Sequence, residues 1–442
     1  MGQTHVVMER RWDTKMIFEV VLLILMVTTF LVCAIKFKLP SGISIICSAV
    51  LGLIVYSFTR MEIFLEIPRH LIEGSFAYFD VVLVIVCAMI YMSIIEKAGT
   101  LDAFSVLIVR KFYKYPTFML IALMLLIMIP SMITGSSVTA VITSGALVAP
   151  VLVALGIPKT KAAAIIGAGA IFGVVAPPVN IPVMVICEIV DLPYMGFELP
   201  LLVLSLPLAI FTVLFLGRKH VNKVNIEEIK NKINFNIQNE VNALVYLPLI
   251  TLFVLLILVQ VFPFVIAPLG MPLIFIISAL PALFVGKKQN VLHTVKLAVD
   301  KSLPTMAMLL GVGMFVQAIT LNGVRGAFVI LVLQLPVVLQ YVAMAIAIPV
   351  FGAISAFASA SIFGGPYVLS LVIYGAVPVA CGISMLASIG DILPPIAIAG
   401  STSAKIVGEE RYLNVFKQLL IPIGVIIIYT MLYITVIAPA IF

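Results

Sequence analysis

Apolar runs about as long as a lipid bilayer is thick recur from one end of this chain to the other. One of them, VVLLILMVTTFLVCAI, covers residues 20–35 without a charged side chain, and a spanning helix needs roughly 20 such residues. Hydrophobic residues make up 63% of the chain and charged residues 10%, against about 45–50% and 25% in soluble domains. The sequence therefore predicts an all-α polytopic membrane protein, because helices satisfy their own backbone groups in lipid.

Two of the apolar runs carry the same interruption. GVVAPPVNIP occupies residues 173–182, and GDILPPIAIA occupies residues 390–399. Proline has no backbone N–H and breaks a helix, and in hydrocarbon each freed carbonyl needs another partner. Transporters built from inverted repeats place such discontinuous helices around a polar site near the bilayer midplane. We therefore expect both double-proline segments to be helix breaks that border a polar cavity.

The two breaks belong to a longer internal repeat. An offset of 217 residues aligns the double prolines with each other, Gly173 with Gly390 and Gly135 with Gly352. Further upstream, IIEKAGTLDAF matches AITLNGVRGAF at a slightly larger offset. The predicted organisation is an N-terminal segment (1–15), a first repeat (16–217), a polar linker or arm (218–243) and a second repeat (244–442).

Loop charges indicate that the second repeat is inverted relative to the first. The loop at 59–75 carries a net charge of −1, whereas its counterpart at 287–301 carries +3. Basic loops favour the cytoplasmic side, so the first loop is expected outside and the second inside. The basic linker is also expected in the cytoplasm. The mildly basic stretch at 9–15 disagrees, because this topology places the N-terminus outside.

Each repeat is predicted to contain five crossings and one re-entrant hairpin. The first hairpin covers 117–156, with its tip near Thr134–Thr139, and the second covers 327–373, with its tip near Gly352–Ser361. The predicted crossings are 17–36, 43–58, 77–95, 161–190 and 199–217 in the first repeat, and 244–262, 271–286, 304–321, 378–403 and 419–438 in the second.

Candidate binding groups gather at the tips and the breaks. The tips are rich in Gly, Ser and Thr, as in ITGSSVTAVITSG, so their backbone can approach a ligand closely. Asp391 is an acid in an apolar context, where a carboxylate is expensive and is often functional. A structural role for Asp391, as an N-cap or a salt-bridged acid, is the alternative. Asn180 follows the first break, where its amide would cap the next half-helix or bind a carboxylate.

The sequence lacks the motifs that are typical of several classes of protein. The sequence has no P-loop, no HExxH and no nucleophile elbow, so we expect neither an enzyme nor an ATPase. The four histidines are scattered without metal-ligand spacing, and no cofactor is expected apart from Na⁺ as a coupling ion. The net charge of +7 comes from loops beside apolar spans, so nucleic acid is not an expected partner. Coupling would come from an ion gradient or from a separate subunit.

The long motif at 128–185 and IGDILPPIAIAG at 389–400 resemble the large membrane subunit of tripartite ATP-independent periplasmic (TRAP) transporters, and more broadly the ion transporter superfamily. The resemblance covers most of the chain. It implies Na⁺-driven uptake of a small organic anion, often a C4-dicarboxylate, by an elevator motion in the inner membrane. It also implies a small membrane subunit and an extracytoplasmic solute-binding protein as partners, besides membrane lipid.

Binding residues carried over from this resemblance lie at the same four places. At the first tip and the first break they are Gly135, Ser136, Ser137, Thr139, Gly173, Ala176, Pro177, Pro178 and Asn180. At the second tip and the second break they are Gly352, Ser355, Ser359, Gly390, Asp391, Pro394 and Pro395. Backbone carbonyls at Gly135, Gly173, Gly352 and Gly390 would coordinate Na⁺.

Other functions remain open at this point. An H⁺-coupled exporter with Asp391 as the carrier is the nearest alternative, together with a stand-alone carboxylate permease that needs no binding protein. A channel would need charged rings along a hydrated pore, and a membrane-embedded enzyme would need a catalytic cluster of acids or histidines. The sequence displays neither feature.

Overall fold

The computed structural model describes residues 2–221, 243–261, 269–287 and 289–442, and within them every regular element is helical. Eight helical segments among these residues are long and apolar enough to cross a membrane. The predicted all-α polytopic fold is therefore confirmed. The linker was predicted at 218–243; residues 222–242 of it lie outside the described residues, whereas 218–221 are the last residues of the helix Glu198–Val221.

The described residues before the linker form eleven α-helices, which include the predicted hairpin and the predicted break. They are α1 (Gly2–Leu31), α2 (Ser41–Ser57), α3 (Ile67–Phe76), α4 (Phe79–Ala98), α5 (Thr100–Phe112), α6 (Pro116–Thr134), α7 (Ser137–Ala140), α8 (Ala146–Ala154), α9 (Lys159–Val175), α10 (Ile181–Ile189) and α11 (Glu198–Val221). A π-helical turn, Val141–Gly145, joins α7 to α8.

The described residues after the linker repeat this order. Their helices are α13 (Leu247–Val261), α14 (Met271–Phe284), α15 (Val291–Leu321), α16 (Val324–Gln334), α17 (Val337–Gly352), α18 (Ala356–Ser370), α19 (Ala376–Ile389), α20 (Ile398–Val407), α21 (Tyr412–Leu432) and α22 (Ala438–Ile441). Thus α6 corresponds to α17, and the broken helix α9–α10 corresponds to α19–α20.

Helices of one half pack against helices of the other half in equivalent pairs, as a two-fold repeat requires. Helix α2 packs against α15, and α14, the counterpart of α2, packs against α4. Helix α10 packs against α18 of the second hairpin, while α20 packs against α7 and α8 of the first. Gly99 and Gly323, which the sequence comparison aligned, both adopt left-handed conformations, with φ of 85° and 79°, between a long helix and a short one. The repeat boundaries and the opposite orientation in the membrane stay predictions.

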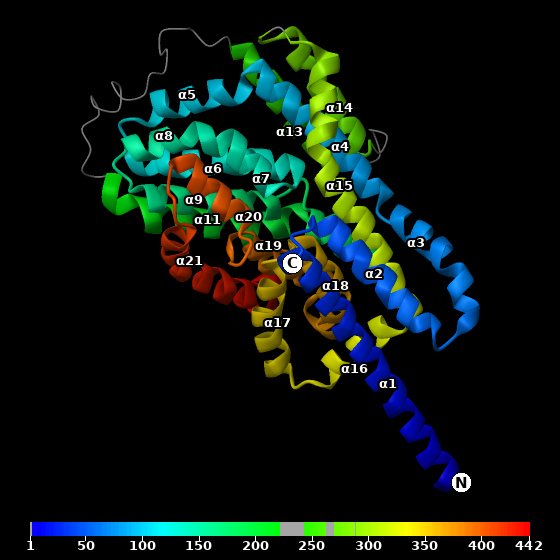
Figure 1. The fold of residues 1–442 in the computed structure, drawn as a ribbon. Helices are drawn as coiled ribbons and strands as arrows, with labels where there is room; N and C mark the ends of the chain where they lie inside the picture. The colour runs from blue at the N-terminus through cyan, green and yellow to red at the C-terminus, as the bar shows by residue number, and fades with distance from the viewer. Residues whose placement is uncertain (1, 222–242, 262–268, 288) are drawn as a thin grey trace.

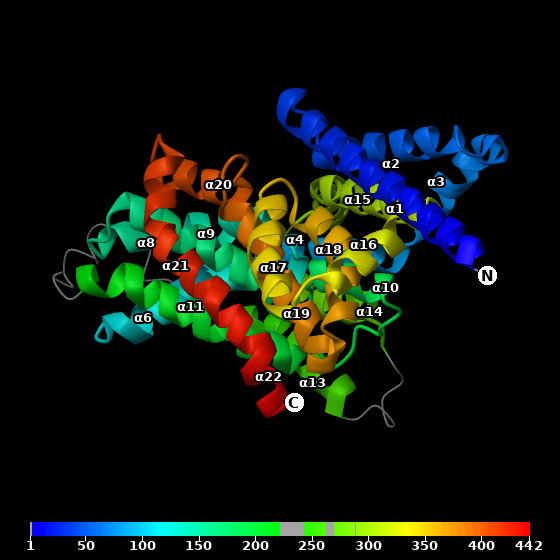
Figure 2. The same cartoon turned by 90° about the horizontal axis from the view of Figure 1, so that it is seen from below.

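The helices form two packed groups. One contains α1–α4 with α13–α15, and the other, called the hairpin group because it includes both hairpins, contains α6–α11 with α17–α21. Figures 1 and 2 show α1, α2, α3 and α15 on one side of the molecule and α8, α9, α20 and α21 on the other. The groups meet where α4 contacts α6 and where α15 contacts α18.

Two predicted boundaries in the second repeat are wrong. The hairpin begins at Val337 rather than at 327, because residues 324–334 form the separate helix α16, which ends just before Pro336. The crossing expected at 304–321 begins at Val291, because α15 is one helix of 31 residues. The charges that suggested a loop at 287–301 lie mostly on the first turns of α15, and Pro304 does not end the helix.

Candidate transport site

The first hairpin tip lies where the sequence predicts it, between α6 and α7. Gly135 has a φ of 65°, a conformation that suits glycine. A Cβ at Gly135 would lie 2.5 Å from Cδ1 of Ile181, so the tip packs closely on the start of α10. Ser136 is the N-cap of α7, and its hydroxyl accepts a hydrogen bond from the N–H of Thr139 at 3.4 Å. This geometry leaves Ser137 in the first turn of the returning helix.

The second tip repeats this capping. Ser355 is the N-cap of α18, and its hydroxyl accepts a hydrogen bond from the N–H of Ala358 at 3.3 Å. Ser359 is fully buried and donates a hydrogen bond to the carbonyl of Ile348 at 2.8 Å, which ties α18 to α17. Ser355 therefore lies at the tip itself, whereas Ser359 holds the hairpin together behind it.

The second break brings an acid to the first tip. After α19 the chain makes a short 3₁₀ turn, Gly390–Ile392, and reaches α20 through Pro394 and Pro395. The hydroxyl of Ser137 donates a hydrogen bond to Oδ2 of Asp391 at 2.5 Å, across 254 residues of sequence. Within the described residues no ion pair to Asp391 is formed. The carboxylate is thus bound by a neutral partner at the meeting point of the two halves.

These elements enclose a cavity of about 380 Å³. Six of the predicted site residues line it: Gly135, Ser136, Ser137, Thr139, Ser355 and Asp391. The opposite wall comes from α15 and from the first residue of α2, which contribute Ser41, Lys301, Pro304, Thr305 and Met308. The cavity therefore lies between the two helix groups, with an acid on one side and an ammonium on the other.

The first break lies away from this cavity, in a closed hydrogen-bond network. Asn180 is fully buried; its Oδ1 accepts hydrogen bonds from the N–H of Val183 at 3.0 Å and from the hydroxyl of Ser384 at 2.8 Å. Its Nδ2 donates to the carbonyl of Val175 at 2.9 Å, and the hydroxyl of Tyr194 donates to the carbonyl of Pro178 at 3.0 Å. Of the described residues that line the cavity, none comes from residues 173–180.

The remaining predicted residues support helix packing. A Cβ on Gly173 would lie 1.9 Å from Oγ of Ser131, so α9 and α6 touch there. A Cβ on Gly390 would lie 1.9 Å from the carbonyl carbon of Gly352, so the second break rests on the second tip. The other predicted residues outside the described cavity lining are Ala176, Pro177, Pro178, Pro394 and Pro395.

Lys301 is a cavity residue that the sequence reasoning missed. Its charge was counted toward a cytoplasmic loop, whereas it lies on α15. Lys301, Pro304, Thr305 and Met308 follow the spacing i, i+3, i+4 and i+7, which places them on one face of a helix. This spacing was the available signal for a polar, cavity-facing stripe.

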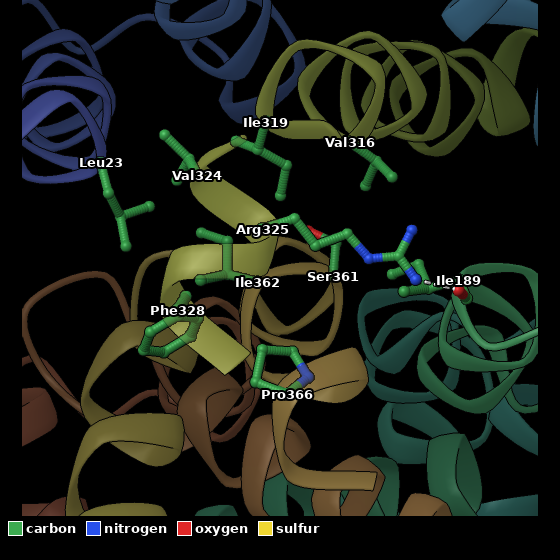
Figure 3. A pocket seen from close by; sticks show the side chains of 10 residues that line it. All are labelled: Leu23, Ile189, Val316, Ile319, Val324, Arg325, Phe328, Ser361, Ile362 and Pro366. Atoms are coloured by element: carbon green, nitrogen blue, oxygen red, sulfur yellow. Dashed lines mark hydrogen bonds between the residues drawn. The ribbon is translucent and has the colours of Figure 1, made fainter. Parts of the chain in front are cut away.

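A second, much smaller cavity lies between α1, α15, α16 and α18, beside the end of α10 (Figure 3). Its volume is about 10 Å³, enough at most for a water molecule. Arg325 points across it and donates a hydrogen bond to the carbonyl of Ile189, at the C-terminal end of α10. A cation at that end complements the helix dipole, so Arg325 anchors α10 to α16, and this cavity is not a solute site.

Within the described residues no cluster of His, Cys, Asp and Glu side chains offers a metal site. Three or more His, Cys, Asp or Glu side chains do not converge anywhere among them. The oxygen atoms at the large cavity, a carboxylate and several hydroxyls, are ligands of the kind that hard cations prefer.

Comparisons with known proteins agree with a transport role. Residues 13–217 match the sequence model of the Na⁺/H⁺ antiporter family, a region that contains the first hairpin and the first break. A search of curated proteins finds no match. The family similarity and the helical membrane architecture indicate an ion-transporter-like, multi-pass membrane protein rather than an enzyme. They do not single out the large subunit of TRAP transporters.

Proposed function

We propose that this chain is a cation-coupled secondary active transporter whose large cavity is the transport site, with Asp391 as the group that binds the coupling cation. The observation that carries this proposal is the Asp391–Ser137 contact, which joins the second break to the first hairpin tip on the cavity wall. Similarity of residues 13–217 to the Na⁺/H⁺ antiporter family supports cation coupling.

The charge of Asp391 explains why a cation belongs there. A carboxylate within a membrane is costly unless an opposite charge or a proton accompanies it. The hydroxyl of Ser137 is a neutral partner, and it offers an oxygen lone pair toward a bound ion. Na⁺ is the proposed coupling ion because carboxylate and hydroxyl oxygens can coordinate it together. A proton on Asp391 is the alternative.

The solute in this proposal is a small organic anion that enters with Na⁺. A volume of about 380 Å³ falls at the lower end of the range for small-molecule sites, roughly 300–1,000 Å³. The C4-dicarboxylate class, the inner membrane and the two TRAP-type protein partners rest on the resemblance of the sequence motifs. An elevator motion would move the hairpin group against α15, since these form the two opposing walls of the cavity.

Two measurements test the coupling. Binding of radiolabelled Na⁺ to the purified protein, without any solute, should be saturable and should be lost in Asp391→Asn. Asp102→Asn is the matched control, because Asp102 is half-exposed and pairs with Lys287 at 3.9 Å, away from the described cavity lining. In proteoliposomes, an imposed Na⁺ gradient should drive solute uptake that a pH gradient alone does not.

The outcomes separate the candidate functions. Transport that follows pH and requires Asp391, without Na⁺ binding, identifies the proton as the coupling ion. Unchanged, gradient-dependent transport in Asp391→Asn refutes the role of this residue. A steady ionic current in planar bilayers would instead establish a channel.

A further inference from the structure

The described lining of the large cavity contains one basic side chain, Lys301. It comes from α15, whereas Asp391 comes from the opposite helix group. The two formal charges of the cavity therefore stand on different walls. When a cation neutralises Asp391, Lys301 is the charged residue that remains among the described residues lining the cavity.

Glu96, near the end of α4, contacts this ammonium. Nζ of Lys301 lies 3.5 Å from Oε2 of Glu96, and the two side chains are 50% and 36% exposed. An ion pair this long and this accessible to water is weak. A carboxylate that arrives in the cavity can therefore replace Glu96 at the ammonium without breaking a buried pair.

The single ammonium of Lys301 can neutralise one carboxylate of a bound solute. A second carboxylate on the solute would enter the cavity without a cationic partner among the described lining residues, and an unpaired charge in such a place is unfavourable. The other polar groups there are hydroxyls, from Ser41, Ser136, Thr139 and Thr305 among others. Hydroxyls can bind a neutral hydroxyl or keto group of the solute, because they both donate and accept hydrogen bonds.

We infer that Lys301 recognises the transported solute through a single carboxylate, that the solute is a small monocarboxylate, and that Glu96 occupies the ammonium when the solute is absent. This inference rests on the proposed function, since it takes the large cavity as the transport site. It narrows the solute from organic anions in general to those with one carboxylate, and it replaces the C4-dicarboxylate class that the sequence resemblance implies.

The test uses purified full-length protein in the presence of Na⁺. Thermal shifts are recorded with a panel of monocarboxylates (acetate, propionate, lactate, pyruvate, 3-hydroxybutyrate) and of dicarboxylates (malonate, succinate, malate). At least one monocarboxylate should stabilise the wild type more than any dicarboxylate does. In proteoliposomes, uptake of that radiolabelled monocarboxylate then gives KM and the maximal rate.

The variants separate recognition from folding. Lys301→Gln should raise KM at least tenfold, and Lys301→Arg, which keeps the charge, should recover most of the affinity. Glu96→Gln removes the competing carboxylate, so KM should fall by roughly twofold to fivefold. Lys287→Gln is the matched control, because Lys287 also pairs with an acid, Asp102, but lies outside the described cavity lining.

Failure of the inference is distinguishable from failure of the proposed function. If the wild type binds Na⁺ in an Asp391-dependent way but responds only to dicarboxylates, or to none of the panel, the inference is wrong while the coupling site stands. An unchanged KM in a folded Lys301→Gln protein also overturns it. If transport by the wild type depends on neither Na⁺ nor pH, the proposed function itself is wrong.

Discussion

Gly352 and Gly390 touch backbone to backbone: a Cβ built on Gly390 would lie 1.9 Å from the carbonyl carbon of Gly352 and 2.5 Å from the amide nitrogen of Ala353. The atoms in the way are main-chain atoms, which cannot move aside as a flexible side chain can. This contact holds the second break against the second hairpin tip, beside the turn that carries Asp391.

Gly390→Ala should therefore lower the free energy of unfolding by about 3 kcal/mol or more, beyond the usual cost of overpacking. Thermal unfolding in detergent measures this effect. Gly424→Ala is the control, because nothing lies within 4 Å of a Cβ at Gly424. Equal melting temperatures for the two variants would contradict the close contact.

Ser137→Ala should weaken cation binding without preventing folding. The variant loses the hydroxyl oxygen that the proposed site offers to the cation beside Asp391, so the Kd for the coupling cation should rise about tenfold, which corresponds to about 1.4 kcal/mol. Equilibrium binding of radiolabelled Na⁺ checks this. Ser401→Ala serves as the control, because Ser401 is half-buried outside the described cavity lining and its hydroxyl donates to the Ile398 carbonyl of its own helix. A Kd equal to that of the wild type would exclude Ser137 from the ion site.

Asn180→Ala should reduce stability rather than affinity. The amide of Asn180 caps α10 and joins it to Ser384 and to Val175, so its loss leaves buried groups without partners, at a cost of about 1–3 kcal/mol. The melting temperature should fall, while KM and the cation Kd, measured on folded protein, should stay within about twofold of wild type. Ser384→Ala removes one of these bonds and should give a smaller shift. A large rise in KM would instead favour direct binding by Asn180.

A covalent link between the two cavity walls should stop transport if the hairpin group moves against α15. Oγ of Ser355 lies 4.0 Å from Sδ of Met308, in the contact between α18 and α15. Met308→Cys with Ser355→Cys, in a background without the five native cysteines, should lose uptake on oxidation and regain it on reduction. The single variants Met308→Cys and Ser355→Cys, which cannot form this link, are the controls and should keep their uptake under oxidation. Full uptake by the oxidised 308–355 pair would rule out the elevator motion.

Much of the helix arrangement can be predicted from local patterns in the sequence. Apolar runs reveal spans, and paired prolines reveal breaks because no continuous helix can accommodate them. Gly135 marks the first tip because a left-handed turn there suits glycine. The start of α15 was missed, since Lys296, Asp300 and Lys301 are equally compatible with a loop and with the exposed turns of a helix.

The site was only partly predictable, because depth in the membrane and tertiary partners decide it. Asn180 and Asp391 both stand beside double prolines, yet one lies in a closed network and the other faces a cavity. Their difference depends on what approaches each break: Ser384 meets Asn180, and Ser137 meets Asp391. Neither pairing is visible in the local sequence, since each joins residues more than two hundred positions apart.

The length of α15 has a consequence for the kinetics of the site. Its 31 residues extend about 46 Å, against roughly 30 Å of hydrocarbon, so part of this rod projects into water. Lys301 is the eleventh residue of α15, and its side chain is 50% exposed, so its charge acts on ions in solution over a Debye length of about 8 Å. Lys301 therefore attracts an anion that is still in solution, and the association rate constant of the solute should decrease as ionic strength rises.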